Sequence, residues 1–362
     1  MADPTPNIDK WALWTSGKTL LRGANVFQRT MPNGEWCSKL SADFFKDLAA
    51  AGANYVNLSI PGTYNVKPPL PHDPNAPWQS LYGEIGSART RLDELTDWAK
   101  DEGLWIVLSF RSAPGRSETD VVAEGSAEIV RDLFSPKPEF SAQPREAFAD
   151  MWRTIARRFK NHANIAAYDL LVEPHRPRES PQGEQWSIDP FRETWRNIAC
   201  ETIKAIRAED RLTPIIVGID EDSSMLALPN WKPLGCVDPA NALRVVYGLH
   251  QYEPFEYTHE SEPFDPVFTK LLEMFAIMDN WQTANPGWHF AVNEFGVKCD
   301  QQSAAKFIEK EFGELTKRGC NHAIWLWDDP KGGCYDPKMS LTEKPTFFKA
   351  VKNEWAKNKV GP

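Results

Sequence analysis

The sequence lacks the long apolar runs and the leader-like start that mark membrane and exported proteins. None of its hydrophobic stretches approaches the roughly 20 residues that a membrane-spanning helix needs. Its first residues, MADPTP, contain neither the basic region nor the apolar core of a secretory signal. We therefore expect no membrane span and assign no location. The protein would be secreted or periplasmic if a signal was removed, and cytoplasmic otherwise.

Excess basic charge, metal-binding motifs and nucleotide-binding motifs are also missing. The net charge of -9 disfavours a phosphate backbone as partner, so we expect no nucleic acid. The six cysteines form no C-x-x-C pair and no zinc-type spacing with histidine, which predicts no metal site and leaves one or two disulfides open. GKT at 17–19 has alanine where a phosphate-binding loop needs its first glycine, and no G-x-S-x-G elbow is present. No cofactor is implied.

What the sequence has in abundance is tryptophan. Its 15 indole rings are broad amphipathic surfaces that suit the flat faces of pyranose sugars. Most of them are nevertheless expected in the core, because large aromatic rings are mostly buried in folded proteins. A neutral sugar polymer is therefore compatible with the composition but not specified by it.

Short apolar runs alternate with amphipathic stretches along the chain. Helices are predicted where apolar residues recur at helical spacing, as in the stripe from Phe148 to Phe159. Eight β-then-α units close as a (β/α)8 barrel, and we assign residues 1–362 to a single α/β domain of this type. Extended loops on its carboxyl-terminal face are expected at 61–77 and 174–189. The predicted strands are 20–26, 55–60, 104–110, 165–171, 214–219, 243–249, 289–292 and 323–327.

Two glutamates fall where the chemistry of such a barrel is expected. Glu173 follows the fourth predicted strand and Glu294 the seventh, and the strands of a barrel end at one shared face. Side-chain alternation predicts that Glu173 shares the inward face with Asp169, and Glu294 with Phe290 and Val292. Cleaving a glycosidic bond with retention requires an acid and a nucleophile held roughly 5 Å apart. Because two carboxyls in one cavity repel, the pKa of one is expected to rise, which makes it the proton donor.

Four motifs, in order along the chain, resemble glycoside hydrolase family five, which contains the cellulases and mannanases. They are YDLLVEPH at 168–175, LHQY at 249–252, NEFG at 293–296 and IWLW at 324–327. The resemblance implies that Glu173 is the general acid and base and that Glu294 is the nucleophile. It also implies that His250 and Tyr252 support them, with the tyrosine donating to the nucleophile.

The resemblance further implies residues that contact the sugar. A tryptophan after the eighth strand floors the sugar site in this family, and Trp327 is preferred over Trp325 because it lies nearer the expected strand end. His175 follows the acid/base motif and is expected to line the cleft. His259 is interpreted as an ordinary loop residue.

The sequence departs from the family pattern at three positions. Ser59 stands in the segment where the family has an arginine that supports the nucleophile, and Arg111 stands where a histidine would hold a sugar hydroxyl. We hypothesise that Arg111 supplies the missing charge from the neighbouring strand, although a structural pair with Glu118 is equally open. Val172 replaces an asparagine that bonds the sugar 2-hydroxyl, which predicts a slower enzyme or a sugar that differs at C2.

These observations predict a retaining β-glycosidase that hydrolyses a β-linked glycan or glycoside of glucan or mannan type by double displacement. The departures leave one alternative, a carbohydrate-binding barrel from the same family with little or no turnover. The expected partner is a carbohydrate, and the chain is a monomer or an oligomer of unknown size.

Overall fold

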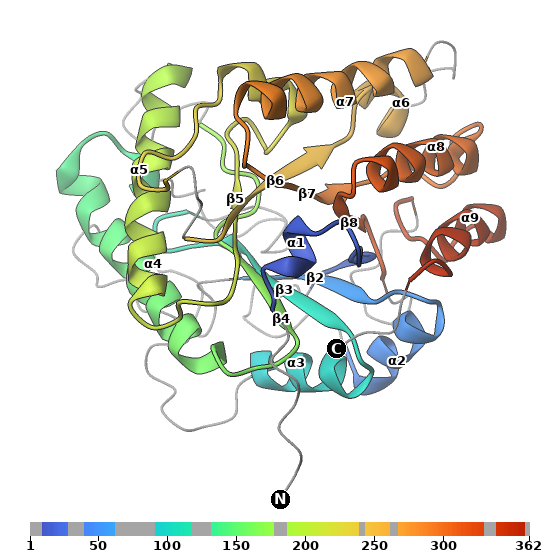
Figure 1. The fold of residues 1–362 in the computed structure, drawn as a ribbon, viewed down its shortest axis with the longest axis horizontal. Coiled ribbons are helices and arrows are strands. Elements are labelled where there is room, and N and C mark those ends of the chain that lie inside the picture. Colours follow the sequence, from blue (N-terminus) through green and yellow to red (C-terminus); the bar gives the residue numbers. More distant parts are fainter. Residues whose placement is uncertain are drawn as a thin grey trace, which may run out of the picture.

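The computed structural model of the protein describes residues 9–27, 40–61, 91–116, 132–176, 187–238, 243–260, 267–328 and 338–358. Its centre is a closed barrel of eight parallel strands that follow one another in chain order (Figure 1). The predicted (β/α)8 barrel is therefore confirmed. The strands are β1 Arg22–Phe27, β2 Tyr55–Pro61, β3 Trp105–Ser112, β4 Ile165–Asp169, β5 Ile215–Gly218, β6 Val245–Gln251, β7 Phe290–Phe295 and β8 Asn321–Ile324.

Helices surround the barrel, because each crossover between parallel strands returns along its outside (Figure 1). The stripe from Phe148 to Phe159 lies in α4 and is buried against the strands, as its spacing predicted. Between β5 and β6 the described residues carry a short 3₁₀ helix, η3, instead of an α-helix. The helices are α1 Ala12–Thr15, α2 Ala42–Ala50, α3 Arg91–Asp101, η2 Asp132–Phe134, α4 Pro138–Phe159, α5 Ile188–Arg207, η3 Met225–Asn230, α6 Phe255–Thr258, α7 Val267–Ala284, α8 Ala304–Lys317 and α9 Pro345–Trp355.

The short helix α1 closes the amino-terminal end of the barrel, where it crosses the centre of Figure 1. Leu13 and Trp14 pack there against inward-facing strand residues such as Val107 and Ala291. The indole Nε1 of Trp14 also donates to the carbonyl of Ala166 at 3.0 Å. An apolar plug therefore fills one end of the barrel.

Three strand boundaries differ from the sequence prediction in ways that matter for the site. β4 ends at Asp169, so Glu173 lies four residues beyond the strand. β7 extends to Phe295, so Glu294 lies inside a strand and does not follow one. β8 ends at Ile324, so Trp325 and Trp327 lie beyond the strand that was predicted to reach residue 327.

Several other sequence predictions concern loops and cysteines. Residues 62–77 and 177–186 of the expected active-face loops lie outside the described residues. Cys200 and Cys236 form a disulfide between α5 and the segment after η3, whereas Cys299 and Cys320 are buried thiols. Most of the described tryptophans are buried, as expected.

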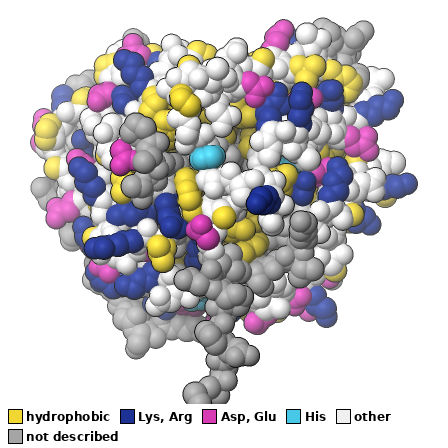
Figure 2. All heavy atoms as spheres, in the orientation of Figure 1, with side chains coloured by type: hydrophobic (Ala, Val, Ile, Leu, Met, Phe, Trp, Pro, Cys, Tyr) yellow, Lys and Arg dark blue, Asp and Glu magenta, His cyan; other side chains and the backbone are white. Residues whose placement is uncertain are grey.

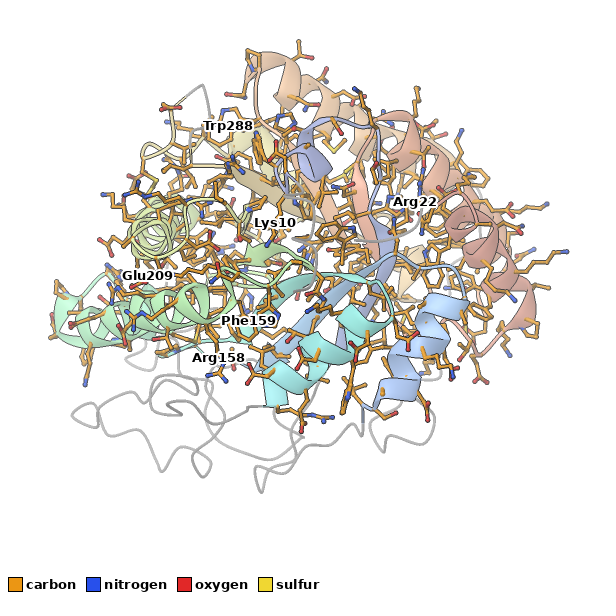
Figure 3. The ribbon with its side chains drawn as sticks, turned by 60° about the horizontal axis from the view of Figure 1, so that its bottom comes forward. Lys10, Arg22, Arg158, Phe159, Glu209 and Trp288 are labelled. Atoms are coloured by element: carbon orange, nitrogen blue, oxygen red, sulfur yellow. A yellow bond between two sulfur atoms is a disulfide. The ribbon has the colours of Figure 1, made fainter. Side chains whose placement is uncertain are left out.

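The outer layer is held by ion pairs between elements far apart in sequence. Arg22, at the start of β1, forms an ion pair with Glu354 of α9, in which Nε lies 2.9 Å from Oε1, and both side chains are buried (Figure 3). On the face drawn in Figure 2, acidic and basic side chains are interspersed. No helix among the described residues is both long and apolar enough to span a membrane.

Replacing Trp14 by alanine is expected to lower the free energy of unfolding by about 3–5 kcal/mol, because it empties the barrel plug. Trp14→Phe keeps an aromatic ring but loses the bond to Ala166, so about 1–2 kcal/mol is expected for it. Urea titration followed by circular dichroism measures both. A loss below about 1 kcal/mol for the alanine variant would show that α1 does not support the barrel.

Candidate active site

The carboxyl ends of the strands bring together the two glutamates singled out from the sequence. One carboxylate oxygen of Glu173, one of Glu294 and a ring nitrogen of His250 all lie within 4.8 Å of one another. Glu294 is almost fully buried, whereas the side chain of Glu173 keeps 22% of its surface exposed. This separation agrees with the roughly 5 Å of a retaining pair and is too short for the water that an inverting pair must admit.

Glu294 reaches the barrel interior through an irregularity of β7. Ala291 and Asn293 are the inward-facing residues, whereas Phe290 and Val292 pack outward against the helices. The register of β7 against β8 shifts between Val292 and Phe295, and its register against β6 also shifts at this level. Such a bulge changes the side to which the following residue points. The prediction that Glu294 shares its face with Phe290 and Val292 is therefore wrong, although the residue does lie in the site.

Glu173 points into the site because of its backbone and not because of strand alternation. Its φ of 52° is in the left-handed region, which a glutamate rarely adopts. The guanidinium of Arg116 donates to the Glu173 carbonyl at 2.9 Å, and a ring nitrogen of His175 lies 3.1 Å from the same oxygen. His175 also lies 3.0 Å from Asp222. His175 thus supports the acid/base segment, and its contact with a sugar stays a prediction.

Arg111 lies between the two glutamates. Its Nη2 forms an ion pair with Glu294, and its Nη1 is 3.8 Å from Glu173 Oε2. The guanidinium also lies over the rings of Phe27 and Trp325, 5.1 and 4.6 Å from their centroids. The cation that Ser59 cannot provide is therefore supplied from β3, as hypothesised. Glu118, the alternative partner, lies outside the described residues.

Two residues contact the glutamates directly, one in β6 and one immediately after it. Tyr252 donates its hydroxyl to Glu294 Oε1 at 3.0 Å, and His250 Nδ1 lies 2.9 Å from Glu173 Oε1. Burial alone would lower the pKa of His250, but the charge of Glu294 and the bond to Glu173 together raise it above its ordinary value. Burial and the two carboxylates raise the pKa of Tyr252, so its hydroxyl remains a donor.

His259, interpreted from the sequence as an ordinary loop residue, packs against Tyr252 and forms no hydrogen bond with either glutamate, all three being residues that the structure describes. Its ring lies edge-on to Tyr252 at 4.8 Å and stacks on Phe255 at 4.2 Å. Burial lowers the pKa of His259, and the charge of Lys298 lowers it further. It therefore packs as a neutral ring behind the tyrosine that contacts Glu294.

The two tryptophans after β8 have different surroundings. Trp325 is partly exposed and contacts Phe27 and Arg111, which places it at the site. Trp327 is buried, and its ring packs against Phe44, Phe348 and Trp355 of the helical layer. The preference for Trp327 was therefore wrong, because position after a strand does not tell which ring turns toward the barrel axis.

The site includes polar residues to which the sequence analysis assigned no role. Besides Arg116, five side chains form a hydrogen-bonded layer in the barrel beneath the charged groups. Their only signal in the sequence was their place at inward positions of otherwise apolar strands. They are Asn25, Asn57, Ser109, Asp169 and Asn293.

Within the described part of the chain, Glu173, His250 and Glu294 are the one group with the spacing of metal ligands. The guanidinium of Arg111 already neutralises this pocket and would repel a second cation. The chemistry that fits the three groups is therefore proton transfer and nucleophilic attack.

An eight-stranded barrel with one buried and one partly exposed glutamate at this separation defines the class of retaining glycosidases. Comparison with known proteins identifies the family. The model of the cellulase family, glycosyl hydrolase family 5, matches residues 16–331. The chain therefore belongs to glycosyl hydrolase family 5, and it is a retaining glycoside hydrolase of the glucan or mannan type.

The relatives are distant in sequence but similar in structure. Endoglucanase C of Acetivibrio thermocellus is 27% identical over 279 residues, which cover 75% of this chain and 69% of the relative. The solved structure of the endoglucanase Cel5A from Thermotoga maritima has a TM-score of 0.67 and 20% identity, with 95% of this chain and 100% of that chain covered. The same protein in complex with mannotriose gives a TM-score of 0.64 and 19% identity, with 92% and 98% covered.

Replacing Arg111 by methionine is expected to reduce kcat/KM by about 10²- to 10³-fold, because it removes a charged donor fixed on Glu294. Initial rates on an activated aryl β-glycoside measure this loss.

Arg158→Met is the matched control, because it breaks an arginine–carboxylate pair outside the site. Arg158 donates to both oxygens of Asp93 at 2.8 and 2.6 Å and lies in the helical layer (Figure 3). Near-equal losses in the two variants would contradict a specific role for Arg111.

Proposed function

We propose that the protein is a β-glucanase that works by double displacement, with Glu294 as the nucleophile and Glu173 as the general acid and base. The observation that carries the proposal is the pair of carboxylate oxygens within 4.8 Å at the open end of the barrel. The names of the relatives, which are endoglucanases, support action within a β-glucan chain. Residues 1–362 act as one catalytic barrel in this proposal.

The surroundings of the two carboxyls divide their roles. Glu294 receives a charged hydrogen bond from Arg111 and a neutral one from Tyr252, which fix the position of its carboxylate. Glu173 is more exposed and is bonded to His250, so it can exchange protons with solvent during turnover. A fixed anion and an accessible proton carrier are what the two steps require.

In the first step, Glu294 attacks the anomeric carbon and the bond from this carbon to the leaving oxygen breaks. Glu173 gives its proton to that oxygen, so the leaving sugar departs as a neutral alcohol. In the second step, Glu173 takes a proton from water, and the resulting hydroxide displaces Glu294 from the anomeric carbon. Arg111 and Tyr252 hold Glu294 in place throughout.

Trp325 is the proposed platform for the sugar whose anomeric carbon reacts. It is the tryptophan that contacts Arg111, and part of its ring is exposed. Its neighbour Phe27 extends the aromatic surface, with ring centroids 6.0 Å apart. Flat rings of this kind stack on the apolar faces of pyranose sugars.

Alanine variants of the two glutamates test which is the nucleophile and which is the acid and base, because each variant should form a different glycosyl azide. Glu294→Ala is expected to reduce kcat by about 10⁴-fold or more, and azide is expected to rescue it by forming an α-glycosyl azide from the face that the carboxylate occupied. Glu173→Ala keeps the nucleophile and should form the β-glycosyl azide, with most of its first step preserved on aryl glycosides that need no proton. Proton NMR distinguishes the two azides.

Glu209→Ala serves as the control, since this carboxylate pairs with Arg157 on the outside of the barrel (Figure 3). It should hydrolyse the substrate with retention and form no azide product. If wild-type protein bound glucan without releasing sugar, the non-catalytic alternative would replace the proposal. The β-azide from Glu294→Ala would reverse the two roles.

Val172 is proposed to lie beside the sugar C2. Its side chain is buried and belongs to neither apolar cluster of the barrel. Its backbone is fixed by the hydrogen bond from its N–H to the Phe110 carbonyl at 2.9 Å. Val172→Asn is expected to raise kcat/KM on an aryl β-glucoside by about 10-fold, because an amide can bond the 2-hydroxyl in the transition state.

The matched substrate for this comparison is the 2-deoxyglucoside. The ratio of variant to wild-type rates should be close to one on it, since no 2-hydroxyl is present. An equal gain on both substrates would mean that the asparagine acts elsewhere in the site.

A further inference from the structure

Asp169 is a buried carboxyl that neither the family roles nor the proposed mechanism uses. It is the last residue of β4 and is 1% exposed, one layer below the catalytic groups. Its Oδ2 lies 3.1 Å from Ser109 Oγ and 2.7 Å from Asn293 Nδ2. Asn293 precedes Glu294 in β7, so this carboxyl is connected to the strand that carries the nucleophile.

The directions of the hydrogen bonds that Asn25, Asn57 and Ser109 form follow from backbone acceptors. Asn25 Nδ2 lies 3.0 Å from the Asn293 carbonyl and 3.1 Å from the Ala323 carbonyl, so the amide orientation of Asn25 is fixed. Asn25 Oδ1 must then accept from Asn57 Nδ2 at 2.7 Å. Asn57 is thereby fixed as well, and its Oδ1 is an acceptor that faces Ser109 Oγ at 2.6 Å.

Ser109 has one hydroxyl proton and two neighbours. A 2.6 Å contact with Asn57 Oδ1 requires a proton between the oxygens, and only Ser109 can supply it. Ser109 Oγ then presents lone pairs to Asp169 Oδ2 at 3.1 Å. If Asp169 were ionised, the lone pairs of its oxygen and of Ser109 Oγ would face each other with no proton between them. Such a buried contact between two acceptors destabilises the folded protein.

We propose that Asp169 is a positioning residue that stands as a neutral carboxylic acid, donates its proton to Ser109 and accepts from Asn293, and that its ionisation limits activity at high pH. The first part stands on the proton count alone. The second part rests on the proposed function, because it concerns turnover by Glu294 and Glu173.

The charged and titratable groups around Asp169 come from four other strands. Tyr55 of β2, Arg111 of β3, His250 of β6 and Glu294 of β7 all interact electrostatically with it. Burial raises the pKa of Asp169 to about 7 and Glu294 adds to the rise, although the charges of His250 and Arg111 oppose it, as a hydrogen bond donated by Ser109 would. The acid is therefore neutral below about pH 7 and ionises as the pH rises above it.

A neutral Asp169 has two consequences for the site above it. The charge of Arg111 is left to Glu294 and Glu173, because no third carboxylate competes for it. The bond to Asn293 also holds β7 at the residue next to the nucleophile. Ionisation would add a third negative charge that competes for Arg111 and would remove the proton that bonds Ser109, whereas the bond donated by Asn293 would remain.

Infrared difference spectra between wild type and Asp169→Asn test the protonation state without requiring activity. At about pH 6 the wild type is expected to show one extra carboxylic-acid C=O stretch, which should fade as the pH passes about 7. Only carboxylate bands in the difference spectrum at that pH would overturn the proposal. Circular dichroism checks that the variant is folded.

Ser109→Ala is a second variant that decides the direction of the bond even if Asp169→Asn does not fold. If Asp169 donates to Ser109, the substitution removes an acceptor that favours the neutral acid, and the acid band should titrate at lower pH. If Ser109 donates to an ionised Asp169, the band should instead titrate at higher pH, and the proposal fails.

The alkaline limb of kcat/KM tests the link to turnover. In the wild type, both the general acid and Asp169 lose a proton as the pH rises, so kcat/KM should fall by up to about 100-fold per pH unit. In Asp169→Asn only the general acid loses a proton, so kcat/KM should fall by about 10-fold per pH unit. Equal slopes would overturn the positioning role. Absence of glycosidase turnover in wild type would refute the proposed function instead, and the infrared result would stand separately.

Discussion

The buried ion pair between Arg111 and Glu294 is the interaction on which the active site depends. Two carboxylates with oxygens within 4.8 Å repel strongly in an interior of low dielectric. A guanidinium between them offsets this repulsion, and the rings of Phe27 and Trp325 keep it in one plane. Losing the cation would leave a buried charge unpaired, which is far more costly than losing a surface pair.

The interior of the barrel changes in polarity from one end to the other. Apolar residues and the α1 plug fill the amino-terminal end, a layer of amides with Ser109 and Asp169 follows, and the charged groups lie at the open end. The middle layer lets the strands carry polar groups without water, because each donor is directed at an acceptor. This layer therefore lies between the apolar core of the barrel and the charged groups of the active site.

Much of the fold could be predicted from the sequence because its signals are local. Helical stripes such as that of α4 and the alternating rhythm of strands require only neighbouring residues. Strand ends were less predictable: β7 continues past Glu294, because pairing with β6 extends the strand beyond its apolar run. The side of β7 to which the Glu294 side chain points was predicted wrongly for a related reason. A bulge arises from how two strands pair and not from the sequence of either strand alone.

The sequence by itself determined the barrel, the identity of the two glutamates, and the histidine and tyrosine that accompany them. These follow from residue types placed after apolar runs, and from motifs that keep their order along the chain. Only the tertiary structure decided which tryptophan faces the site, which residue replaces the missing arginine, and that Asp169, Ser109 and Asn293 form one bonded layer. Those outcomes depend on distances across the barrel between residues far apart in the chain, which no local pattern encodes.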